Sequence, residues 1–243
     1  MSYYESHDIV ELSELWRERV DSFPGLKNKI RTACQKGPVL SDDERKSSSN
    51  NRPRNDAFSF LVAGKFLAAG ISVVSVDGIA SGDFTCQSNA DFTFRWEGTY
   101  INVECKRLQS EAQLLRRAKE AEKQITRSGR CGTIVMDCSA LCRRAGHLLD
   151  NSDPDKAEFG LSKRLETEIG PEVLRSLSPT ILGFMLSVRI PAMTYTGTIL
   201  SPSGMRPQRR DVILSWLIIA DPKHKNFEIL RSVYSMLNAQ HLE

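Results

Sequence analysis

The sequence has no marked excess of charge of either sign. Its 243 residues include 33 Lys and Arg against 30 Asp and Glu, a net charge of +3, so a global polycation is excluded. There is also no signal-peptide pattern and no run of eighteen apolar residues, the minimum that a membrane-spanning helix needs. We therefore expect a soluble, cytoplasmic protein that makes no contact with a membrane.

Cysteine and histidine are few and scattered. The six cysteines have no disulfide-framework spacing, and the four histidines form no HExxH motif, so we expect neither a disulfide scaffold nor a zinc site. The chain also lacks a G-x-S-x-G motif, a P-loop and a G-x-G-x-x-G motif. The usual signatures of serine hydrolases, nucleotide hydrolases and dinucleotide-binding folds are therefore missing.

What is present is an ordinary globular composition. Apolar residues make up 40% of the chain and charged residues 26%, which suits one sizeable domain with or without an extension. Hydrophobic periodicity, with Pro and Gly as breakers, predicts alternating helices and strands. The expected helices cover residues 8–22, a short segment ending at 34, and residues 55–69, 110–128, 160–176 and 230–239. The expected strands cover residues 71–76, 131–137, 180–188 and 212–219.

The helix expected over 110–128 is amphipathic. Its spacing predicts an inward apolar stripe of Ala112, Leu115, Ala118, Ala121 and Ile125. After this helix, the strand over 131–137 would return parallel to an earlier strand, through a right-handed crossover.

A hairpin is expected between residues 91 and 106. Glu97-Gly98 can form a two-residue turn, because Gly accepts the positive φ that such turns require. Asp91 then lies opposite Glu104, and alternation places Lys106 on the same face. The other face is apolar and consists of Phe92, Phe94, Ile101, Val103 and Cys105.

Two facing carboxylates repel each other, because directly opposed residues have Cβ atoms only about 4.5–5.5 Å apart. A cation between Asp91 and Glu104 would relieve that repulsion. Carboxylate oxygens with water suit Mg²⁺ or Mn²⁺, and Lys106 could hold or activate a water or neutralise a phosphate. Metal, lysine and carboxylates together suit phosphodiester hydrolysis.

Asp91 on one strand and Glu104-Cys105-Lys106 on the next resemble the motif of the PD-(D/E)XK nuclease superfamily, which has the restriction-endonuclease-like fold. The resemblance covers roughly residues 54–138. Residues 54–70 look like the helix before the first strand, and residues 121–125 and 133–137 look like the following helix and strand.

The resemblance implies an α/β domain of three layers with a central mixed β-sheet over residues 54–241. A helical extension over 1–36 and a linker or loop over 37–53 would precede it. In this arrangement Asp91, Glu104 and the backbone carbonyl of Cys105 would bind Mg²⁺ or Mn²⁺, and Lys106 would position or activate the attacking water.

The family's first helix often carries a Glu at the position that is Ser59 here. Asp56, nearly one turn earlier, is the candidate replacement ligand. Asp83 is a second candidate for the first acid, but the hairpin register favours Asp91.

Basic residues are concentrated next to this motif. Eight of them, against three acids, fall between residues 106 and 130, and such a stripe attracts a phosphate backbone. A solvated helix face with internal ion pairs is the alternative. The candidate cleft or nucleic-acid-binding residues are Gln124, Arg107, Arg116, Arg117, Lys123 and Arg127.

The expected function is a metal-dependent endonuclease with DNA as its substrate. The alternative, favoured by Ser59, is a catalytically inactive nuclease-fold protein that acts as a nucleic-acid-binding or assembly module. In a third reading the hairpin acids are ordinary surface residues. The apolar N-terminal helices could join two copies into a homodimer.

Overall fold

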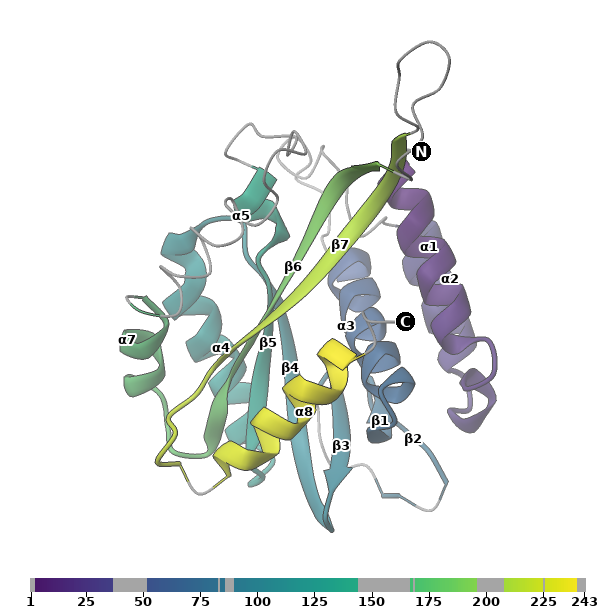
Figure 1. Ribbon diagram of the computed structural model, residues 1–243. Helices are drawn as coiled ribbons and strands as arrows, with labels where there is room; N and C mark the ends of the chain where they lie inside the picture. Colours follow the sequence, from purple (N-terminus) through teal and green to yellow (C-terminus); the bar gives the residue numbers. More distant parts are fainter. Residues whose placement is uncertain are drawn as a thin grey trace.

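The structure is a computed structural model, which describes residues 3–36, 52–82, 84–85, 90–143, 167, 169–195, 208–224 and 226–239. Its centre is a seven-stranded sheet in the order β2-β1-β3-β4-β5-β6-β7, with helices on both faces (Figure 1). The helices are α1 (Tyr3–Trp16), α2 (Leu26–Lys36), α3 (Arg52–Ala68), α4 (Leu114–Thr126), α5 (Ser139–Arg143), α7 (Gly170–Arg175) and α8 (Phe227–Ala239), with short 3₁₀ turns η1 (Val20–Ser22) and η3 (Glu111–Gln113). The strands are β1 (Ser72–Val76), β2 (Ile79–Ala80), β3 (Phe92–Trp96), β4 (Thr99–Arg107), β5 (Gly132–Asp137), β6 (Ile181–Tyr195) and β7 (Gln208–Ile219).

The sheet is mixed, as predicted. Strands β4, β5 and β6 run parallel to one another, whereas the other four of the six neighbour pairings are antiparallel. The predicted parallel return after the long helix is confirmed, because β5 follows α4 and pairs parallel to β4. Strand β4 therefore lies in the middle of the sheet, between an antiparallel hairpin partner and a parallel neighbour.

The predicted hairpin and its register are confirmed. Glu97 and Gly98 have φ values of 45° and 80°, the positive values that a type I′ turn needs at both central positions. Thr93 pairs with Asn102 and Arg95 pairs with Tyr100. The Thr93 hydroxyl also donates to the Asn102 side-chain oxygen at 2.9 Å, so the register is fixed by side chains as well as by the backbone.

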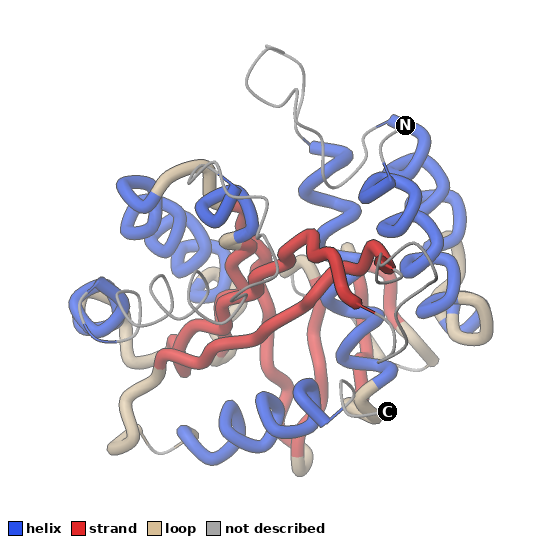
Figure 2. Tube along the Cα trace, turned by 45° about the horizontal axis from the view of Figure 1, so that its top comes forward, coloured by secondary structure: helices blue, strands red, loops and turns tan. Residues whose placement is uncertain are grey.

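Alternation along the central strands separates two hydrophobic cores. Val103 and Cys105 of β4 pack in one core with residues of α3 and α8. Ile134 and Met136 of β5 point to the opposite face and pack with α4. Figure 2 shows the helices on both sides of the twisted sheet. The coarse expectation of a mixed α/β architecture is therefore confirmed.

The two N-terminal helices share the first of these cores. Leu12 and Trp16 of α1 and Leu26 of α2 are buried with the residues of α3, and the Trp16 indole donates a hydrogen bond to the Phe60 carbonyl at 3.0 Å. The segment expected to be a helical extension is thus helical and packs directly on the central domain.

The prediction of which residues of the long helix point inward was wrong for its first residues. Leu115 is 48% exposed and Ala112 is exposed too, whereas Leu114 is buried beside Ala118. The reason is that the α-helix begins only at Leu114, after the 3₁₀ turn η3. Leu114, Ala118, Ala121 and Ile125 then follow the spacing that keeps one face inward.

Several element boundaries also differ from the prediction. The first helix covers Tyr3–Trp16 rather than residues 8–22. Helix α3 already begins at Arg52, since Pro53 fits in a first helical turn. Strand β6 continues to Tyr195. Asp83, most of the expected linker over 37–53, and residues 160–166 and 168 of the helix expected over 160–176 lie outside the described residues, whereas the end of that helix is α7.

Candidate active site

The hairpin brings three of the predicted residues together. Asp91 immediately precedes β3, and its Oδ2 accepts a hydrogen bond from the backbone N–H of Cys105 at 2.7 Å. Glu104 and Lys106 lie on the face of β4 opposite to Cys105, with Lys106 Nζ 2.7 Å from Glu104 Oε2. Two carboxylates and one ammonium therefore meet towards the end of the central strand.

Lys106 is a cation at neutral pH. Burial lowers its pKa, but the carboxylates of Glu104 and Asp91 raise it more, so that its pKa lies above the ordinary value. The ammonium can therefore attract an anion or hold a water molecule. It is not suited to take a proton from that water while it keeps these neighbours.

The two carboxylates resist being charged together. Burial and the nearby Asp91 raise the pKa of Glu104 to about 7, although the Lys106 ammonium opposes this. Burial also raises the pKa of Asp91, against the opposing effects of Lys106 and the Cys105 N–H. One lysine is thus too little positive charge for the two acids, and a further cation would let both ionise.

One carboxylate oxygen has no protein donor. Glu104 is fully buried, and within the described part of the chain its Oε1 has no hydrogen-bond partner. Buried polar atoms are normally satisfied, so this oxygen fits a metal ligand. Among the described residues no group of three or more His, Cys, Asp or Glu side chains could hold a metal ion. Two carboxylates, with the Cys105 carbonyl and water, would have to hold it.

A further acid at the site was missed by the sequence reasoning. The backbone N–H of Asp77 donates to the Asp91 carbonyl at 2.7 Å, and the Asp77 carboxylate contributes to the raised pKa of Asp91. Asp77 and Gly78, with φ values of 47° and 75°, form the turn between β1 and β2. An Asp-Gly pair between apolar residues is a hairpin signal, so the pattern was available.

Asp56 lies within electrostatic reach of Asp91. Burial and then the Asp77 carboxylate raise the pKa of Asp56, and Asp56 in turn raises that of Asp91. Its Oδ2 is 4.0 Å from Nε of Arg52. The position of Asp56 on α3 is therefore compatible with an accessory metal ligand. That role of Asp56 remains a prediction.

Ser59 and Cys105 contribute no charge. The Ser59 hydroxyl donates to the Asn55 carbonyl one turn earlier, at 3.0 Å, and the side chain is buried. Burial, followed by the carboxylates of Asp91 and Glu104, raises the pKa of the Cys105 thiol well above its usual range. The thiol is hence protonated and unreactive.

Several of the predicted cleft residues form ion pairs within the protein. Arg107 is buried in an ion pair with Asp137 (Nε to Oδ2, 3.2 Å). Arg116 and Arg117 both pair with Glu120, at 3.5 Å and 2.8 Å. Lys123 and Arg127 are exposed, and Gln124 is half-buried. The ion-pair alternative thus describes part of this stripe, and contact with nucleic acid remains a prediction for all six residues.

The metal-free protein is expected to lose stability as the pH rises from about 4.5 to about 7. A carboxyl group with a raised folded-state pKa stabilises the fold while it is protonated, and this stabilisation disappears as the pH passes the folded value. For Glu104 the pKa rises from 4.5 to about 7, which corresponds to about 3 kcal/mol. Urea unfolding in EDTA at several pH values measures it.

Glu104→Gln isolates this contribution, because glutamine does not titrate. The difference in unfolding free energy between wild type and Glu104→Gln should change with pH, whereas that for Glu228→Gln, at an exposed position of α8, should stay constant. Mg²⁺ should restore wild-type stability at pH 8. A pH-independent difference for Glu104→Gln would contradict the assignment.

Comparisons of this chain with family models, with curated proteins and with solved structures give no significant match. None of the helices in the described part of the chain is long and apolar enough to cross a membrane. The case for a function therefore rests on the geometry of the site.

Proposed function

We propose that the protein is a metal-dependent endonuclease that hydrolyses phosphodiester bonds, with DNA as its substrate. The observation that carries the proposal is the buried carboxylate of Glu104, which contacts the Lys106 ammonium, has one oxygen with no donor among the described residues, and lies near the half-buried Asp91. Such a site favours a divalent cation and an anionic substrate.

Each residue has a separate task in this proposal. Asp91, Glu104 and the Cys105 carbonyl would hold Mg²⁺ or Mn²⁺, which supplies Lewis-acid activation of water and neutralises charge on the phosphate. Lys106, as an ammonium, orients that water or pairs with a phosphate oxygen. The low exposure of Glu104 and Lys106 strengthens both interactions, because a buried charge is poorly screened.

The order of elements supports the restriction-endonuclease-like assignment within this proposal. Helix α3, strand β1, the β3–β4 hairpin, helix α4 and strand β5 follow one another, which is the helix–strand–hairpin–helix–strand order of the PD-(D/E)XK resemblance. The short strand β2 and residues 81–91 are inserted before the hairpin.

A catalytically inactive nucleic-acid-binding module is the second candidate. It is favoured by Ser59, whose hydroxyl binds its own helix where the family often has a metal-binding Glu. In that case the protein binds DNA and does not cut it.

The deciding experiment incubates the protein with plasmid, linear duplex, single-stranded DNA and RNA, each with Mg²⁺, Mn²⁺ or EDTA. We expect DNA cleavage with either metal and none in EDTA. Glu104→Gln, purified in the same way, controls for a contaminating nuclease and should be inactive. DNA binding without cleavage would favour the module, and equal cleavage by Glu104→Gln would refute the site.

A further inference from the structure

Helix α2 contains basic residues and no acidic ones. Its eleven residues, LKNKIRTACQK, include Lys27, Lys29, Arg31 and Lys36. The first three of these side chains are exposed, whereas Leu26 and Ala33 turn inward. The helix therefore presents a wholly cationic and polar outer face, separate from the basic stripe of α4.

One flank of α2 reaches the candidate site through Lys29. Lys29 Nζ lies 2.6 Å from the Asp77 carboxylate and 3.0 Å from the Asp77 carbonyl, and the Asp77 N–H is bonded to the carbonyl of Asp91. Only one residue thus separates the α2 surface from the first metal-binding acid. Lys29 also lowers the pKa of Asp56, so its charge acts on two acids of the site.

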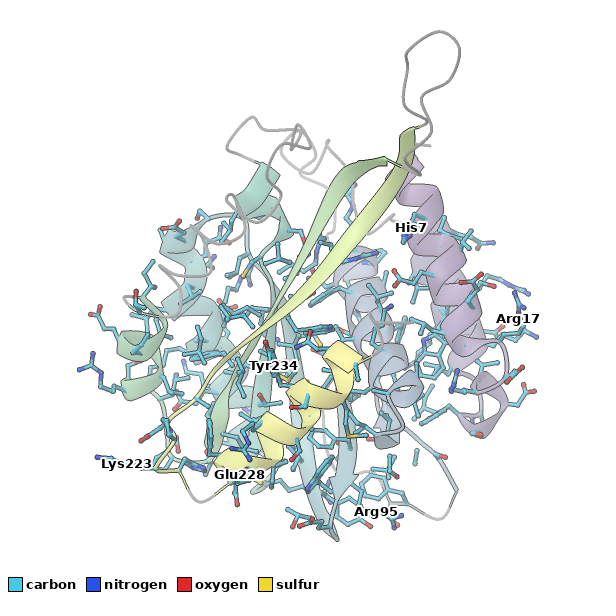
Figure 3. The ribbon with its side chains drawn as sticks, in the orientation of Figure 1. His7, Arg17, Arg95, Lys223, Glu228 and Tyr234 are labelled. Atoms are coloured by element: carbon cyan, nitrogen blue, oxygen red, sulfur yellow. The ribbon has the colours of Figure 1, made fainter. Side chains whose placement is uncertain are left out.

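The contact between Lys29 and Asp77 can exchange. Their side chains are 45% and 48% exposed, and an ion pair at such positions is worth at most about 1 kcal/mol. A phosphate can therefore replace Asp77 as the partner of Lys29 at little cost. Lys27 and Arg31 lie in a groove between α1 and α2 that also carries Arg17, which directly follows α1 and is labelled in Figure 3.

We propose that the exposed cations of α2 bind the phosphate backbone of duplex DNA beside the candidate site, with Lys29 on the flank next to Asp77 and Lys27 and Arg31 together on the other flank. The inference rests on the proposed function and extends it, since it names the surface that holds the substrate. Charge complementarity and continuity with the site identify the occupant. An acidic site needs cations at its rim if a polyanion is to approach it.

The test compares two triple variants that remove the same charge. Lys27→Gln, Lys29→Gln and Arg31→Gln change the α2 face. Arg175→Gln, Lys223→Gln and Arg231→Gln change exposed cations of α7, the β7–α8 connection and α8. Figure 3 places Lys223 on the side of the molecule opposite α1 and α2. All proteins carry Lys106→Ala, for which the proposed function predicts strongly slowed cleavage.

Binding of a fluorescent 30-bp DNA duplex is measured by anisotropy over a range of salt concentrations, and thermal unfolding checks the fold. The α2 triple should weaken binding about tenfold or more and reduce the slope of log K against log salt by about two to three, because each lost phosphate contact removes about 0.9. Lys29→Gln alone should reduce the slope by about one. The control triple should leave the slope nearly unchanged.

Equal affinity and equal slope for the two triple variants would overturn the inference. This would hold even if the wild-type protein cleaved DNA much faster than Lys106→Ala, a result that would uphold the proposed function. An acidic protein surface would then be the better occupant of α2. Conversely, a selective effect of the α2 triple on a protein that never cuts DNA would support the inference and reject the nuclease. A protein that neither binds nor cuts DNA would reject both.

Discussion

Replacing Lys106 with Ala is expected to lower the rate of DNA cleavage by about 10²- to 10³-fold, the usual effect of removing a group that stabilises charge in a transition state. The ammonium lies 2.7 Å from Glu104 and is the cation that the structure places at the paired carboxylates. Single-turnover cleavage of a defined duplex measures the rate of the chemical step.

Two comparisons show whether Lys106 acts on the reaction or only supports Glu104. Calorimetry should find that Lys106→Ala still binds Mn²⁺, since both carboxylates remain. Lys106→Arg keeps the charge but has a larger, planar head group, so it should recover little activity. Lys223→Ala, at an exposed position remote from the site, should cleave normally. Cleavage by Lys106→Ala within tenfold of wild type would exclude the proposed role.

Replacing Glu11 with Gln should lower the free energy of unfolding by about 3 kcal/mol, because it removes the carboxylate that pairs with the buried Arg189 and with Lys65. Glu11 Oε2 of α1 lies 2.8 Å from Nη2 of Arg189, a side chain of β6 that is 1% exposed. Its Oε1 lies 2.6 Å from Nζ of Lys65 in α3. Burial raises the pKa of Glu11, but Arg189 and Lys65 lower it more, so Glu11 is ionised.

Urea unfolding at pH 7 measures this effect, with Glu14→Gln, at an exposed position one turn further along α1, as the control. A loss below about 1 kcal/mol for Glu11→Gln would contradict the proposed contribution of Glu11 to stability.

The parts of the structure that follow from neighbouring residues could be predicted from the sequence. The Glu97-Gly98 turn determines the β3–β4 register by local geometry alone. Strand β5 was also placed correctly from local sequence, since a short, mostly apolar segment after an amphipathic helix suits a buried parallel strand. The phase of α4 was wrong because it depended on where the first full helical turn starts, and Leu114 and Leu115 are equally apolar.

Contacts between distant residues could not be predicted in this way. Lys29 and Asp77 are 48 positions apart, and Glu11 and Arg189 are 178 apart. In both pairs, the sequence around each residue is that of an ordinary surface position. Only the packing of α1 and α2 on α3 brings the partners together, and no local pattern records that packing.

In the confirmed hairpin, the number of residues between Asp91 and the turn determines which face of the sheet Asp91 lies on. Side chains alternate between two faces, so one residue inserted between Asp91 and the Glu97-Gly98 turn would move the Asp91 carboxylate to the core side and leave Glu104 facing a different neighbour. Two inserted residues would restore the face but would place Asp91 opposite Lys106 instead of Glu104. Natural length variation should therefore be matched on the two sides of the turn if the paired acids are required, and unmatched changes should coincide with loss of the acids.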